Sequence, residues 1–108
     1  MTLSVAMSIS LSGMQAQQNR AAATAKNVAN AMTPGYDRLQ SKMTTVEGGG
    51  VIARVQPSGE AALPGSSNVD LAEEMLNLVE AEIGFKANAS AWETGADMWD
   101  VLISIKRD

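Results

Sequence analysis

The sequence contains no cysteine and no histidine, and these two absences exclude several classes of chemistry. Disulfides, thiolate nucleophiles and Cys/His zinc sites need residues that are missing, and so does the commonest general base of enzymes. Aromatic residues are also scarce, with two Trp, one Tyr and one Phe in 108 residues. No set of residues combines a nucleophile, a base and an oxyanion donor. We therefore interpret the chain as non-enzymatic and expect it to bind no cofactor and no metal.

Long hydrophobic runs are absent as well. No stretch approaches the roughly 18 apolar residues that a membrane-spanning helix needs, so we expect no direct membrane insertion. The first charged residue is Arg20, and serines dilute the apolar residues before it, which is not typical of a cleaved secretory signal peptide. Basic residues are not interleaved with aromatics, so the sequence does not indicate nucleic-acid binding.

Charge is distributed unevenly along the chain. Residues 1–45 hold four basic residues against one acidic residue, a net +3, and residues 46–108 hold four against eleven, a net −7. The two values add to the formal net charge of −4. A basic half and an acidic half can attract each other, or the opposite half of a neighbouring molecule.

A sharp turn is predicted at Thr33–Tyr36. Proline disfavours the α conformation in the residue before it, and Pro34-Gly35 supplies the two backbone conformations that a type II turn needs. The Ala- and Gln-rich segment before the turn therefore ends as a helix near residues 30–32.

That first helix is predicted over residues 6–31. Residues 4–12 alternate between apolar and small polar residues, which on period alone would indicate a strand. A longer pattern with 4-3 spacing favours a helix, because it includes the shorter pattern. The apolar and small residues of this predicted seam are Met7, Leu11, Met14, Ala21, Ala25 and Val28.

Residues 39–66 differ in character from the helices that flank them. Two short segments of weak alternation surround Gly48-Gly49-Gly50, which predicts a β-hairpin. Proline, glycine and serine then mark a loop up to residue 67. A phosphate-binding role for the three glycines is not indicated, because the Lys-Ser/Thr pair of such loops is missing.

A second long helix is predicted from residue 68 to about residue 104. Asp70 and Glu73 form a pair that resembles a capping box, and acidic residues suit the positive end of the helix dipole. We interpret the glutamates of this helix as a solvated or salt-bridging face. Its 4-3 seam contains Leu71, Met75, Leu78, Phe85, Trp92, Trp99 and Ile103.

Two motifs resemble the terminal signatures of bacterial flagellar basal-body rod and hook proteins. The first runs through Ser12-Gly13-Met14-Gln15-Ala16, residues 25–31 and Thr33-Pro34-Gly35-Tyr36, with Asn27 and Asn30 in its centre. The second runs from Asn68 through Met75 to about Ala89. The motifs stand in the order that the family has, and the likeness covers roughly residues 8–38 and 68–104.

The resemblance implies a mainly α fold, in which two long antiparallel terminal helices form a coiled-coil-like hairpin with a small β-hairpin and loop insert between them. It divides the chain into paired helices over residues 1–38 and 67–108 and an insert over residues 39–66. It also implies a structural rod subunit that assembles with other rod or hook subunits in the periplasm-spanning basal body. Such subunits pass through the flagellar export apparatus without a cleaved signal. The short insert favours a small proximal-rod type.

Physical reasoning alone also predicts an interaction module. If the two seams cover each other, large apolar residues such as Leu76, Val79 and Ile83 remain outside that single interior. Burying each would contribute about 1.5–3 kcal/mol, and small chains without disulfides usually achieve such burial by oligomerising. A soluble helical adaptor or chaperone-like protein of the export system is the alternative function. A peripheral membrane protein is a third one, which the acidic second helix disfavours.

Overall fold

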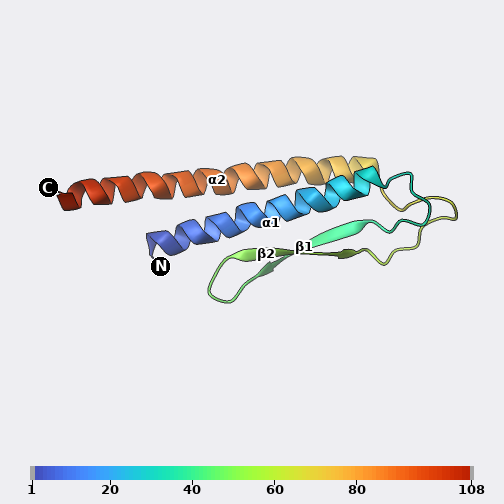
Figure 1. Cartoon of the computed structure of the whole chain (residues 1–108), viewed down its shortest axis with the longest axis horizontal. Coiled ribbons are helices and arrows are strands. Elements are labelled where there is room, and N and C mark those ends of the chain that lie inside the picture. Colours follow the sequence, from blue (N-terminus) through green and yellow to red (C-terminus); the bar gives the residue numbers. More distant parts are fainter. Residues whose placement is uncertain (1, 108) are drawn as a thin grey trace.

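Two antiparallel helices and one β-hairpin make up the computed structural model, which describes residues 2–107 (Figure 1). Helix α1 spans Leu3–Ala29, strands β1 and β2 span Leu39–Thr45 and Val51–Pro57, and helix α2 spans Leu71–Arg107. The molecule is elongated, with principal extents of 70 × 25 × 14 Å. The predicted fold class is thus confirmed. No helix within the described residues is apolar enough over a sufficient length to cross a bilayer.

Helix α1 begins three residues earlier than predicted, and the strand alternative for its first residues is wrong. Thr2 is the N-cap: its side-chain oxygen accepts a hydrogen bond from the Val5 N–H at 3.3 Å. This cap satisfies a backbone donor that the first turn would otherwise leave free, so helical geometry extends to the start of the described chain. The helix ends at Ala29, and Asn30 is its C-cap.

The predicted turn follows the end of α1. The Tyr36 N–H donates to the Thr33 carbonyl at 3.2 Å, and Gly35 has a φ of +76°. A left-handed residue at the third position of the turn defines type II geometry, and glycine adopts it without a steric penalty. The Gly35 N–H also donates to the Ser66 carbonyl at 2.9 Å, which ties this turn to the loop before α2.

Strands β1 and β2 form the predicted hairpin, with Leu39 opposite Pro57 and Thr45 opposite Val51. Gly48, Gly49 and Gly50 all have positive φ and close the turn between them. The hairpin does not remain at the bend between the helices but lies back along α1 (Figure 1). Its tip packs closely there: the Val51 N–H donates to Ser12 Oγ at 3.1 Å.

Helix α2 starts at Leu71, three residues later than predicted, because Asp70 is its N-cap. The Asp70 carboxylate accepts hydrogen bonds from the N–H groups of Ala72 at 3.0 Å and Glu73 at 3.5 Å. Glycines at positions 84 and 95 do not interrupt the helix. Helix α1 lies between α2 on one side and the hairpin on the other, so it is the middle layer of the molecule (Figure 1).

The contact line between the two helices differs from the predicted apolar seams. A Cβ built on Gly13 would lie 2.5 Å from the Asn88 side chain, one on Gly84 would lie 2.7 Å from Gln17, and one on Gly95 would lie 2.6 Å from Met7. The contact residues of α2 therefore lie at positions 74, 77, 81, 84, 88 and 95, and three of these positions come one residue before the predicted seam members Met75, Leu78 and Phe85. Small side chains let the two backbones approach closely, and that approach decides which face turns inward.

Candidate functional site: a polar cluster and an exposed apolar surface

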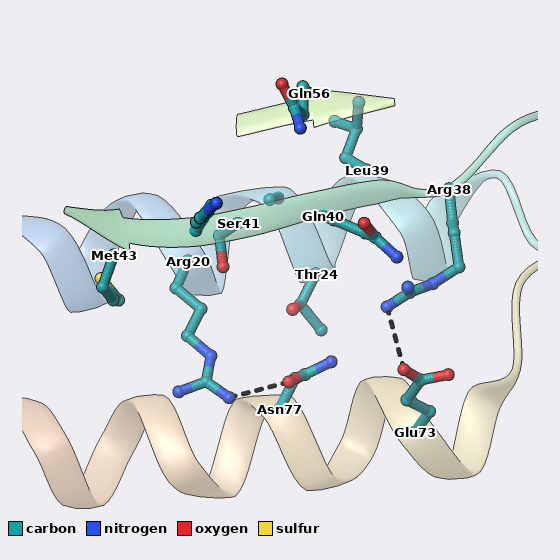
Figure 2. A pocket seen from close by; sticks show the side chains of 12 residues that line it. Arg20, Thr24, Arg38, Leu39, Gln40, Ser41, Met43, Gln56, Glu73 and Asn77 are labelled. Atoms are coloured by element: carbon teal, nitrogen blue, oxygen red, sulfur yellow. Dashed lines mark hydrogen bonds and ion pairs between the residues drawn. The ribbon is translucent and has the colours of Figure 1, made fainter. Parts of the chain in front are cut away.

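Ion pairs join the basic first half of the chain to its acidic second half. Arg20 of α1 forms an ion pair with Glu80 and donates to Asn77 Oδ1 at 2.8 Å. Arg38, just before β1, pairs with Glu74 at 2.9 Å. It also pairs with Glu73 at 3.5 Å (Figure 2). The uneven charge distribution thus produces contacts within one molecule.

A polar cluster formed by Asn27, Tyr36, Arg38, Leu39 and Glu74 joins α1, β1 and α2. The Glu74 side chain is fully buried, and Glu74 Oε1 accepts hydrogen bonds from Arg38 Nε at 2.9 Å and from Asn27 Nδ2 at 3.1 Å. Burying a charge is costly unless it is paired and hydrogen-bonded; Glu74 Oε1 meets both conditions, whereas the buried Oε2 has no hydrogen-bond partner among the described residues. The prediction that the glutamates form a salt-bridging face is confirmed, but Glu74 does not lie on a solvated face.

Asn27 satisfies all four of its side-chain hydrogen bonds within this cluster. Its Oδ1 accepts from the Leu39 N–H at 2.7 Å and from the Tyr36 hydroxyl at 3.0 Å. Its Nδ2 donates to the Leu39 carbonyl at 2.8 Å and to Glu74. The amide thus pairs with both backbone groups of Leu39 as a neighbouring strand would, and so fixes the start of β1 on α1.

A second group of polar side chains holds the end of the hairpin against the start of α2. Asn68 Oδ1 accepts from the Arg38 N–H at 2.7 Å, and Asn68 Nδ2 donates to Asp37 Oδ1 at 2.9 Å. The Ser58 hydroxyl also donates to Asp37, and the Gly59 N–H donates to it at 2.9 Å. These hydrogen bonds, above all those from Ser58 and then Asn68, hold the pKa of Asp37 below its usual value.

The pKa of the Tyr36 hydroxyl is shifted in the opposite direction, to a higher value. Burial raises the pKa of its hydroxyl, and the negative charges of Glu74 and Asp37 raise it further. The phenol therefore stays protonated and remains a hydrogen-bond donor to Asn27.

A groove of about 510 Å³ lies beside the polar cluster, and we call it the edge groove (Figure 2). One wall is β1 from Leu39 to Met43, the floor is α1 at Arg20, Ala23 and Thr24, and the other wall is α2 at Glu73 and Asn77. The groove is lined mainly by polar groups, and Arg20 with Asn77 and Arg38 with Glu73 bond to each other across it, which suits a structural contact better than a reaction.

The predicted seam residues lie on or near the outer surface of the helix pair. Ala21, Leu78 and Phe85 line a shallow apolar groove beside the contact line. Met7 touches Gly95, while Met14 is half-buried and Ala25 is exposed. The large exposed members are Leu11, Val28, Leu71, Met75, Trp92, Trp99 and Ile103. The expectation that the two seams cover each other is therefore wrong for most members, because the glycine-containing line occupies the centre of the contact.

Sequence reasoning missed Arg38, Asn68 and the burial of Glu74. A signal for Glu74 was present: Glu74, Ala81, Asn88 and Gly95 recur every seven residues with small or polar side chains. This repeat has no large apolar member, so a search for hydrophobic periodicity does not identify it as a buried face.

Comparisons with protein families agree with this architecture. The family model described as flagella basal body rod protein matches residues 7–36. The one described as flagellar basal body rod FlgEFG protein C-terminal matches residues 65–105. The chain belongs to the flagellar basal-body rod and hook protein family. The two matched segments correspond to α1 with its turn and to α2 with its N-cap.

Curated relatives of this rod and hook family chain include two flagellar hook proteins FlgE. The protein from Brucella suis biovar 1 (strain 1330) is 39% identical over 41 residues, which are 38% of this chain and 10% of the relative. The protein from Rhizobium meliloti (strain 1021) is 40% identical over 42 residues, which are 39% of this chain and 10% of the relative. The alignment thus spans about a tenth of the length of these relatives.

Proposed function

We propose that this chain is a structural subunit of the flagellar basal-body rod and that it polymerises through its two terminal helices. One observation carries the proposal: the helices satisfy each other through small and polar residues and leave most of their large apolar residues exposed. Leu76 is 60% exposed, Ile83 62% and Trp99 49%. Burial of each such side chain contributes about 1.5–3 kcal/mol, so a surface of this kind favours association.

The end of α2 strengthens this reasoning. Gly13 faces Asn88 and Gly95 faces Met7, so the residue numbers of facing positions add to about 101. Leu3, the first residue of α1, therefore lies opposite residue 98, and α2 from Trp99 onward extends past α1 (Figure 1). Val101, Leu102, Ile103 and Ile105 are all exposed on this overhang. A segment that is apolar on several sides needs neighbours on several sides, as in a polymer.

The short segment between the two matched family segments favours a rod subunit of the small proximal type. Only residues 37–64 separate the two matched family segments, and they form a hairpin and a loop without a further domain. On this proposal the partners are other rod or hook subunits and the flagellar export apparatus, and the chain reaches the periplasm-spanning rod without a cleaved signal. A contact that repeats head to tail without closing on itself gives the helical filament that a rod requires.

The variant Trp99→Asp tests this function. Trp99 is 49% exposed and lies where α2 begins to extend past α1, so we expect unchanged helicity by circular dichroism, loss of concentration-dependent association in sedimentation, and loss of swimming. Ser90→Asp is the matched control, since it places the same charge at an exposed polar position of the same helix. The subunit should be found in purified basal bodies with Ser90→Asp and should be missing with Trp99→Asp.

Two results would contradict the proposal. Normal swimming of the Trp99→Asp strain would show that the exposed surface of α2 is dispensable. A native chain that stays in the cytosol, binds an export substrate at fixed stoichiometry and never enters basal bodies would instead identify the soluble adaptor.

A further inference from the structure

Strand β1 has an open edge that faces the edge groove. In an antiparallel pair, alternate residues bond to the partner strand and the residues between them point their backbone groups away. The Val46 N–H donates to the Gly50 carbonyl and the Ser58 N–H donates to the Arg38 carbonyl, so the even-numbered residues of β1 bond to β2. The N–H and C=O groups of Leu39, Ser41 and Met43 therefore point toward the groove.

Asn27 shows that this edge accepts a strand-like partner. Its side-chain amide bonds to both backbone groups of Leu39 and closes that position. The same groups of Ser41 and Met43 lie further along the edge, where the groove is open (Figure 2). Unpaired strand edges are templates for pairing with another extended segment, and a groove with one strand wall is the usual form of such a site.

We infer that the edge groove binds residues 60–63 of a second copy of this chain as an added third strand beside β1. This segment, Glu60-Ala61-Ala62-Leu63, belongs to no helix or strand, and Leu63 is 77% exposed. It ends before Pro64, and the N–H groups of Ala61, Ala62 and Leu63 make no hydrogen bond within the described residues, whereas the Glu60 N–H donates to Ser58 Oγ at 3.2 Å. The inference goes beyond the proposed function, which concerns the helix faces, since it assigns a separate contact to the hairpin.

Charge favours this occupant. Lys42 lines the groove and Glu60 begins the segment, and neither takes part in an ion pair within residues 2–107. The side chains of Gln40 and Lys42 are exposed, whereas those of Leu39 and Ser41 are half-buried. Because side chains alternate along a strand, Glu60 can lie beside Lys42 while Ala61 and Leu63 point toward the floor of the groove.

The same molecule cannot place its own segment there. The Glu60 carbonyl accepts a hydrogen bond from Asn68 Nδ2 at 3.1 Å, which holds the segment beyond the Arg38 end of β1. Met43 is five residues further along, about 16 Å at the rise of a strand. The segment therefore projects from one end of the molecule, where a neighbouring copy is within reach (Figure 1).

Cysteine cross-linking tests the contact directly, because the native chain has no cysteine. In a parallel added strand, Glu60 opposite Lys42 puts Ala61 opposite Met43; in an antiparallel one, Glu60 opposite Thr44 is still diagonal to Lys42 and gives the same Ala61–Met43 pair. Single variants Met43→Cys and Ala61→Cys are mixed under association conditions and oxidised, and we expect a disulfide-linked heterodimer, since facing Cβ atoms lie about 5 Å apart. Val55→Cys replaces Met43→Cys as the matched control: it is similarly exposed but lies on β2.

A second pair of variants tests whether backbone hydrogen bonds from β1 hold the added strand. Ser41→Pro removes an N–H that points into the groove and makes no hydrogen bond to β2. Val55→Pro is the control, because it removes an N–H that makes no hydrogen bond to β1 and points away from it at the outer edge of β2. Ser41→Pro should lower the yield of the Met43–Ala61 cross-link about fivefold, the loss expected for one backbone hydrogen bond, and Val55→Pro should not.

Three outcomes would overturn the inference. A chain that associates without a Met43–Ala61 cross-link above the Val55 control would overturn this contact alone and leave the proposed function intact. Met43→Cys cross-linking to itself would show that two β1 edges pair with each other instead. A chain that stays monomeric at every concentration would contradict both the contact and the proposed function.

Discussion

Replacing Asn27 by alanine should destabilise the fold more than any other single change in the polar cluster. The side chain is 1% exposed and makes four hydrogen bonds, one of them to the buried charge of Glu74. Neutral bonds contribute about 1 kcal/mol each and a bond to a charged group about 1.5–3 kcal/mol. Part of this loss is recovered where water reaches the freed groups, so we expect a loss of about 3–5 kcal/mol in the free energy of unfolding.

The measurement is thermal unfolding followed by circular dichroism. A loss of 3 kcal/mol should lower the Tm by about 12–24 °C in a domain of this size. The protein concentration must be fixed, because self-association makes apparent stability depend on it. Asn30→Ala is the control, since Asn30 is also near the end of α1 but bonds only to Lys26 and Thr33 at the surface.

The variant Asn27→Asp separates hydrogen bonding from shape. It keeps both acceptor bonds but loses the two donors and places a second carboxylate beside Glu74. Like charges in a buried site raise the pKa of one of them, so this variant should be least stable at neutral pH and should partly recover in mild acid. A Tm shift for Asn27→Ala no larger than that for Asn30→Ala would refute the role of the cluster.

Three further predictions concern the helix contact, the turn and the acid limb of stability. Gly13→Ala should lower stability, because the added Cβ would lie 2.5 Å from the Asn88 side chain, although alanine favours a helix by about 1 kcal/mol over glycine. The double variant Gly13→Ala/Asn88→Ala should recover stability in thermal melts. Additive losses of the two single variants would contradict the close contact. Gly35→Ala should cost about 1–2 kcal/mol by urea titration, since its φ of +76° strains any other residue, and an unchanged midpoint would count against this. The pKa of Asp37 is lowered in the folded protein, so its contribution to the free energy of unfolding is complete above the unfolded value of 3.8 and is lost as pH falls through the folded pKa. Asp37→Asn should therefore flatten the dependence of stability on pH below 3.8. The same dependence in both proteins would be evidence against the hydrogen bonds from Ser58 and Asn68.

The fold was largely accessible from the sequence because its signals are local. Pro34-Gly35 specifies the turn through backbone sterics, and three consecutive glycines specify the hairpin turn. Asp70 also marks the second helix start, although the predicted boundary was three residues early. Each of these features depends on residues within one or two turns of chain, so no tertiary information is needed to find it.

The polar cluster and the inward face of the helices were decided only by tertiary structure. Hydrophobic periodicity predicts that Trp92 and Trp99 turn inward, yet Gly13, Gly84 and Gly95 bring the backbones together on a neighbouring face. Sequence spacing reports which residues share a face but not how closely two helices can approach, and close approach selects the smallest side chains. In the same way, Glu74 resembles any surface glutamate until Arg38 and Asn27, 36 and 47 residues away, meet it in space.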